Sequence, residues 1–414
     1  MRFRAAATLM PVIARSAATK QSSWIATARS ILRRAYGRQV APLAMTILAI
    51  GALTGFVRAA ADDPIKIGQY AALSGKEAAF GTAAHKGVIL AFEEANAAGG
   101  VLGRKVELVT EDNQSKAGES ATIAKKFVSR DKVIAVLGGN PSSNSLEAAP
   151  VLQNAKIPMI AISSTNPRVT EVGNYIFRVC FIDPFQGAVL AKFARDTLHA
   201  KRAALLTSVN NAYSVGISKV FREKFTAGGG EIVAEQKHSE GDKDFRAQLT
   251  AIKAAGADVI FHSSNYTEGA LICIQARQLG FTGPIFGGDA WEAPQLIEIG
   301  GAAVEGTYYS THASPESTAP EVQNFVKKFR ARWDGETPDS IAALGYDAAQ
   351  LLFDSLKRAG TTESGRLREA IATTVKFPGV TGSITIDKDR NATKSAVILT
   401  VKNGKFHYVE TVAP

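Results

Sequence analysis

Short apolar segments alternate with longer amphipathic segments along most of the chain, and this alternation constrains the fold more than any other feature. Residues 65–69 have the length of a strand and include Ile65 and Ile67, and residues 133–137 are a fully apolar run of strand length. Between them, apolar residues recur at the i, i+3, i+4 and i+7 positions from Val88 to Ala95, as on one face of a helix. Strands that alternate with helices form mostly parallel sheets covered by helices. The sequence therefore predicts an α/β fold.

The alternation occurs twice, which predicts two Rossmann-like lobes. A second series of strands begins after residues 177–181 and includes residues 203–207 and 257–261. A length of 414 residues supports this division, because a single hydrophobic core stops growing near roughly 250–300 residues. Hinge segments are expected near residues 178–184 and 306–315. Lobe 1 is expected to comprise residues 62–181 with about 313–375, and lobe 2 residues 182–312 with about 376–414.

The basic charge of the chain is concentrated in its first 61 residues. The formal net charge is +10, but nine of the 48 basic residues and none of the acidic residues lie in this segment. Removing those nine leaves 39 basic residues against 38 acidic residues in the rest of the chain. Proteins that bind nucleic acid need a basic surface to contact the phosphates. We therefore expect no nucleic-acid partner.

The same segment has the pattern of an export signal. Arg33, Arg34 and Arg38 precede an apolar run at residues 41–57, and small residues follow up to Ala61. The run is shorter than the roughly 20 residues that a membrane-spanning helix needs. The sequence thus predicts that residues 1–61 are a leader and signal peptide, cleaved after Ala61, with an uncleaved anchor as the alternative.

Polar loops follow five of the predicted strands. In open α/β sheets, ligands bind beyond the carboxyl ends of the strands. Residues 138–144 and 163–167 belong to lobe 1 and are rich in hydroxyl groups. Residues 210–213, 262–266 and 287–291 belong to lobe 2 and supply an acid and aromatic side chains. These loops are the candidate binding site.

The two sets of loops complement a zwitterion. Hydroxyls and the backbone N–H groups at a helix start bind a carboxylate, whereas a carboxylate such as Asp289 binds an ammonium group. Helix N-caps also favour Ser, Thr, Asn and Asp, and for any single loop capping is the better interpretation. Five such loops at one edge of two sheets favour a site for an amino-acid-like solute.

A series of short motifs runs in a specific order along residues 64–410. They are residues 65–68, 73–75, 96–104, 111–114, 157–160, 177–178, 275–277, 287–289 and 345–348, together with Asp183, Gln186 and Gly187. In this order and spacing, the chain resembles the periplasmic leucine/isoleucine/valine-binding proteins, which have the type I periplasmic binding fold. Members of that family are the solute receptors of branched-chain amino acid ABC importers.

The resemblance assigns roles to residues in both lobes. It implies that Ser142 and the loop of Ser163, Ser164 and Thr165 hold the carboxylate of the solute. Asp289 matches the acidic residue that holds the ammonium group.

Four further residues are expected around the side chain of the solute. By resemblance, Phe80 lines the side-chain pocket and Tyr213 covers the ligand. Asn265 stands where the family has an aromatic residue, with Tyr266 beside it. We therefore expect a more polar pocket than leucine, isoleucine or valine requires.

The resemblance implies a monomeric periplasmic protein that captures an amino acid, of the branched-chain type or more polar, and delivers it to an ABC permease in the inner membrane. A ligand sensor for a membrane receptor, or a binder of amides or small aromatic acids, is the alternative. An enzyme would need Asp289, His262 and a serine to act together, but neither a G-x-S-x-G nor an H-E-x-x-H motif is present. The two cysteines, Cys180 and Cys273, are too few for a disulfide framework. We expect no enzymatic activity, metal or cofactor.

Overall fold

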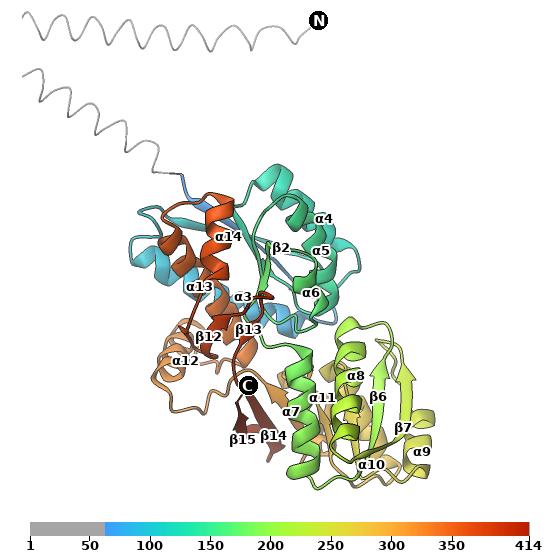
Figure 1. The fold of residues 1–414 in the computed structure, drawn as a ribbon. Helices are drawn as coiled ribbons and strands as arrows, with labels where there is room; N and C mark the ends of the chain where they lie inside the picture. The colour runs from blue at the N-terminus through green and yellow to red at the C-terminus, as the bar shows by residue number, and fades with distance from the viewer. Residues whose placement is uncertain (1–62, 414) are drawn as a thin grey trace, which may run out of the picture. The chain divides into compact units, whose positions relative to one another are not determined.

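Two sheets of mostly parallel strands organise the chain in the computed structural model, which describes residues 63–413 (Figure 1). Residues 64–414 form one compact body. The predicted signal peptide lies outside the described residues. No helix within residues 63–413 is long and apolar enough to cross a membrane.

The first sheet has the strand order β2-β1-β3-β4-β5, and all its neighbouring strands are parallel. Helices α3 and α13 cover one face and α4, α5 and α6 the other (Figure 1). Its strands are β1 (Ile65–Ala71), β2 (Val106–Asp112), β3 (Ala135–Gly138), β4 (Met159–Ala161) and β5 (Ile176–Arg178). Its helices are α3 (Ala78–Ala97), α4 (Glu119–Lys126), α5 (Ser142–Asn154), α6 (Arg168–Glu171) and α13 (Ser340–Ala359).

The second sheet has the order β15-β14-β10-β9-β8-β6-β7, in which only β14 and β15 run antiparallel to their neighbours. Helices α7 and α8 pack on one face, and α9 and α10 on the other. Its strands are β6 (Arg202–Ser208), β7 (Glu231–His238), β8 (Val259–His262), β9 (Ile285–Gly287), β10 (Tyr308–Thr311), β14 (Ala396–Lys402) and β15 (Lys405–Val412). Its helices include α7 (Asp183–Asp196), α8 (Ala212–Ala227), α9 (Arg246–Ala254), α10 (Tyr266–Gln278) and α11 (Pro294–Gly300). The predicted α/β class, with mostly parallel sheets flanked by helices, is confirmed.

Helix α13 crosses α3 at a very short distance, which glycine makes possible. A Cβ atom on Gly345 would lie 2.2 Å from the carbonyl oxygen of Ala84, and one on Gly87 would lie 1.9 Å from that of Ala342. Real Cβ atoms do not approach backbone so closely. The close packing of α13 on α3 therefore requires the glycine at the start of the motif at residues 345–348.

A small antiparallel sheet, with the order β11-β12-β13, follows α12 (Pro320–Arg332), α13 and α14 (Ser364–Ala372). It consists of β11 (Phe377–Gly379), β12 (Gly382–Ile386) and β13 (Ala392–Thr393). Asp347 of α13 accepts hydrogen bonds from the backbone N–H groups of Val380 (2.7 Å) and Thr381 (2.9 Å). The N–H of Arg178 in β5 donates to the carbonyl oxygen of Arg390 (3.3 Å). Residues 377–393 therefore bond to elements of the first sheet, and only β14 and β15 join the second. The lobe boundaries given above stay a prediction.

The chain passes between the two sheets three times. The passages are residues 179–182 after β5, residues 312–319 after β10, and residues 394–395 between β13 and β14. The first lies within the expected hinge segment at residues 178–184, and the second overlaps the expected segment at residues 306–315 only at residues 312–315. That these passages act as hinges stays a prediction.

Candidate functional site

Both sheets have the strand order that creates a binding crevice. In the first sheet, β2 and β3 lie on opposite sides of β1, and in the second, β7 and β8 lie on opposite sides of β6. The loops that leave the carboxyl ends of such strands diverge, and ligands bind where they separate.

A small pocket lies between the loops of the two sheets. Its volume is about 30 Å³, close to that of a single water molecule. Seven of the nine residues predicted from the sequence line it: Phe80, Ser142, Ser163, Thr165, Tyr213, Asn265 and Asp289. Asn140, Pro141, Ala290 and Ile341 complete the lining. Ser164 and Tyr266, the other two predicted residues, do not line it.

Hydroxyl groups form the wall from the first sheet. Ser142 is the first residue of α5, and its Oγ accepts a hydrogen bond from the N–H of Asn166 (3.2 Å). The hydroxyl of Thr165 is buried and lies within hydrogen-bonding reach of the carboxyl group of Asp183, whose pKa burial raises to about 8. Ser164 ties the loops together, because its Oγ donates to the carbonyl oxygen of Gly139 (2.6 Å). This wall thus carries the buried hydroxyls of Ser142 and Thr165 next to a buried acid.

Arg178 holds the loop from Ser163 to Thr165 in place through hydrogen bonds to its backbone. Its guanidinium is fully buried and donates to the carbonyl oxygens of Ser164 and Asn166, the latter at 2.7 Å. Burial lowers the pKa of Arg178 from its ordinary value. The motif at residues 177–178 therefore positions the binding loop without lining the pocket.

Asp289 is the acid of the opposite wall and is held by two neighbours. Its side chain is 6% exposed, its Oδ1 accepts from Nε2 of Gln186 (2.9 Å), and its Oδ2 lies 3.1 Å from Nε2 of His312. The ring of His312 stacks on Phe181, with centroids 3.8 Å apart. Burial lowers the pKa of His312 to about 4, so at neutral pH its imidazole is uncharged and donates through Nε2–H. No cation therefore neutralises Asp289 from this side.

Tyr213 adds a buried hydroxyl to the wall of Asp289. Its oxygen lies within hydrogen-bonding reach of the carboxylate of Asp289. Burial and the nearby charge of Asp289 raise the pKa of Tyr213 well above its ordinary value, so the phenol stays protonated. A Cβ atom on Gly288 would lie 1.9 Å from this oxygen, which explains why glycine precedes Asp289.

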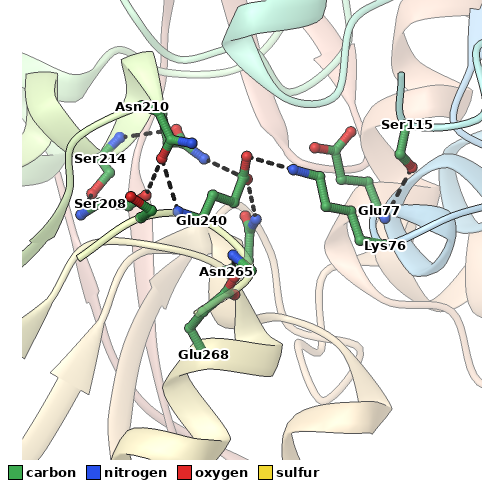
Figure 2. Close-up of polar contacts among 12 residues, drawn as sticks. Lys76, Glu77, Ser115, Ser208, Asn210, Ser214, Glu240, Asn265 and Glu268 are labelled. Carbon is green, nitrogen blue, oxygen red and sulfur yellow. Dashed lines mark hydrogen bonds and ion pairs between the residues drawn. The ribbon is translucent and has the colours of Figure 1, made fainter. Parts of the chain in front are cut away.

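Phe80, Tyr266 and Asn265 meet at the other end of the pocket. The rings of Phe80 and Tyr266 pack edge to face with centroids 5.1 Å apart. Asn265 directs its Nδ2 toward Glu240, whose Oε1 accepts at 2.7 Å (Figure 2). Part of the polar capacity of Asn265 is therefore used within the protein, while the effect of Asn265 on ligand choice stays a prediction.

Capping accounts for one of the helix starts in these loops. Asn211 caps α8, since its Oδ1 accepts from the N–H of Ser214 (3.2 Å). Helices α5 and α10 and the short 3₁₀ helix Asp289–Trp291 have no side-chain cap. For these loops, the capping alternative does not explain the polar residues.

The histidine beside Asp289 is His312 and not His262. Nδ1 of His262 accepts from Nε1 of Trp291 (3.2 Å), and its Nε2 lies 3.3 Å from Nε2 of His238. The grouping of Asp289, His262 and a serine that an enzyme would need is therefore not formed among the described residues.

Gln186 and His312 support Asp289, and no sequence pattern predicts these roles. Gln186 belongs to one of the short motifs, which gives it no partner, and a single histidine carries no positional signal.

Two α/β units with polar loops facing one pocket define a solute-binding protein. The chain belongs to the periplasmic binding protein family, whose model matches residues 64–405. The resemblance to leucine/isoleucine/valine-binding proteins is confirmed by the relatives below.

Three relatives illustrate this membership. The "Amino acid binding protein" of Pseudomonas aeruginosa is 31% identical over 78% of this chain and 86% of its own length. The leucine-binding protein LivK of Thermotoga maritima is 41% identical with a TM-score of 0.82, covering 84% of this chain and 99% of that one. The branched-chain amino acid transporter substrate-binding protein LivJ of Streptococcus pneumoniae, solved with isoleucine, is 35% identical with a TM-score of 0.80, covering 85% and 100%.

Proposed function

We propose that the protein is the solute-binding component of an ABC importer and that it binds an amino acid, of the branched-chain type or more polar. The observation that carries this proposal is that the hydroxyl groups of Ser142, Ser163 and Thr165 line the same pocket as the carboxylate of Asp289. Hydroxyl donors on one wall and an acid on the other suit a ligand that has a carboxylate at one end and an ammonium group at the other.

The two walls suit the two charges of an amino acid. The hydroxyls of Ser142, Ser163 and Thr165 and the N-terminus of α5 supply donors for a carboxylate. Asp289, with no cation against it on the His312 side, supplies an acceptor for an ammonium group. Hydrogen bonds to charged groups contribute about 1.5–3 kcal/mol each. A few such hydrogen bonds, together with apolar contact to Phe80, are enough for a micromolar dissociation constant, which corresponds to a binding free energy of about −8 kcal/mol.

Binding requires the two walls to move apart and close again. A pocket of about 30 Å³ is far below the roughly 300 Å³ or more of typical ligand sites. Rotation about the three passages between the sheets opens the pocket, and closure around the solute removes the charged groups from water. The closed protein then delivers the solute to the permease.

The proposed setting is the periplasm. It rests on the export signal in residues 1–61 and on the family to which the chain belongs. In this setting, the mature protein begins at Asp62 and acts as a monomer.

Calorimetric titration of residues 62–414 tests the proposal. Leucine is compared with leucinamide, which lacks the carboxylate, and with 4-methylpentanoate, which lacks the ammonium group. We expect a branched-chain or more polar amino acid to bind, and its two truncated analogues to bind at least about tenfold more weakly. Binding of neutral amides or benzoates without binding of any zwitterion would contradict the proposal.

A further inference from the structure

A charge pair joins the two sheet units close to the pocket, since its acid, Glu240, is bonded to the pocket residue Asn265. Nζ of Lys76, which lies between β1 and α3, is 2.5 Å from Oε2 of Glu240, which lies between β7 and α9 (Figure 2). The side chain of Lys76 is 47% exposed, whereas that of Glu240 is only 11% exposed. Pairs in which both partners are exposed contribute little, but a carboxylate removed from water interacts more strongly.

Hydrogen bonds within its own sheet unit hold Glu240 in place independently of Lys76. Its Oε1 accepts from Nδ2 of Asn265 (2.7 Å) and from Nδ2 of Asn211 (3.1 Å), and its N–H donates to Oδ1 of Asn210 (2.8 Å). Asn211 and Asn265 follow β6 and β8, the strands at which the order of the second sheet reverses. The position of Glu240 is thus fixed by the loops that form the pocket wall.

The backbone of Lys76 makes a second contact between the two sheet units. Its carbonyl oxygen accepts from the hydroxyl of Tyr266 (3.1 Å), whose ring packs on Phe80. The side-chain contact to Glu240 and the backbone contact to Tyr266 therefore both join the two units next to pocket residues, Asn265 in the first case and Phe80 in the second.

A second acid, Glu77, adjoins this pair. It is buried, and Nδ2 of Asn144 donates to its carboxyl group (3.2 Å). Burial, together with the negative charge of Glu240, raises the pKa of Glu77 to about 7. Lys76 is the cation between two acids of opposite units, and the acids repel each other when it is removed.

We propose that Lys76 and Glu240 form a latch that holds the two units closed and thereby sets the rate at which bound solute leaves. The latch rests on the proposed function, since it acts on the solute bound in the pocket. Because open and closed forms differ in the latch contact, its loss raises the dissociation rate constant and leaves the association rate constant almost unchanged.

Stopped-flow kinetics of Glu240→Gln, Lys76→Met and the double variant test the latch with the amino acid that binds wild type most tightly. We expect each single variant to raise the dissociation rate constant about 5- to 30-fold, and the double variant to add little, because one contact is lost in each case. Lys192→Met, which removes an exposed ion pair with Asp196 on α7, is the matched control and should change this rate less than about twofold.

Salt provides an independent readout. Screening from about 0.05 to about 1 M salt should raise the dissociation rate constant of wild type, but not that of Glu240→Gln. The latch is wrong if both single variants stay within about twofold of wild type, or if their effects multiply in the double variant.

Closure can also be measured without solute, which separates failure of the latch from failure of the proposed function. Spin labels at the exposed positions Lys125 on α4 and Ala251 on α9 report the distance between the two units. Glu240→Gln should shift this distribution toward longer distances. An unchanged distribution refutes the latch, whereas absence of binding by every amino acid to wild type refutes the proposed function instead.

Discussion

Replacement of Asp289 by asparagine removes one charge from the pocket and keeps the shape of the side chain. The carboxylate accepts hydrogen bonds from Gln186 and His312 and, as proposed, from the ammonium group of the solute. Loss of one charge-assisted hydrogen bond costs about 1.5–3 kcal/mol, which is roughly a 10- to 150-fold loss of affinity. His312 can adapt to the new amide, because its Nδ1 has no partner among the described residues and can take the proton. We therefore expect weaker binding in a folded protein.

The assay is calorimetric titration at neutral pH with leucine, or with the amino acid that binds most tightly, and with its analogue without the ammonium group. Affinity for the amino acid should fall by at least about tenfold, and affinity for the analogue should not fall, because Asp289 has no cation to bind in it. Asp354→Asn, which affects an exposed pair with Arg358 on α13, serves as the control. Unchanged affinity for the amino acid, or an equal loss for both ligands, would refute the role of Asp289.

Three further predictions concern the framework. Arg178→Met leaves buried carbonyl groups of the loop at 163–167 without a donor, so the free energy of unfolding measured in urea should fall by about 2–4 kcal/mol. Gly345→Ala should cost about 1–3 kcal/mol by the same measurement, since its Cβ would lie 2.2 Å from a carbonyl oxygen of α3, whereas Gly365→Ala, which meets only a side chain, should cost less. The folded protein holds the proton of Glu77 up to about pH 7, against an ordinary pKa of 4.5, so its stability should fall as pH rises through this interval. The Glu77→Gln variant should lack this part of the fall, and an identical pH dependence in both proteins would contradict the shift.

The fold class and most of the pocket could be predicted from local sequence patterns. Alternating strand and helix periods determine an α/β sheet, and polar residues after its strands lie at one edge for reasons of topology alone. Ser142, Thr165 and Asp289 line the pocket for this reason. Their roles in binding stay predictions.

The supporting contacts could not be predicted, because they join residues that no sequence period relates. Gln186 lies 103 residues from Asp289, and Asn265 lies 25 residues from Glu240. By resemblance Asn265 is expected to be a polar pocket residue, and the structure also pairs it with Glu240, which does not line the pocket. Which of these contacts form depends on how the loops of two sheets pack.

The three passages of the chain between the sheets have a consequence for the order of folding. The first sheet needs α13 at residues 340–359 to cover one face, and the second needs β14 and β15 at residues 396–412 to complete it. Neither unit can therefore finish folding until the last fifth of the chain is available.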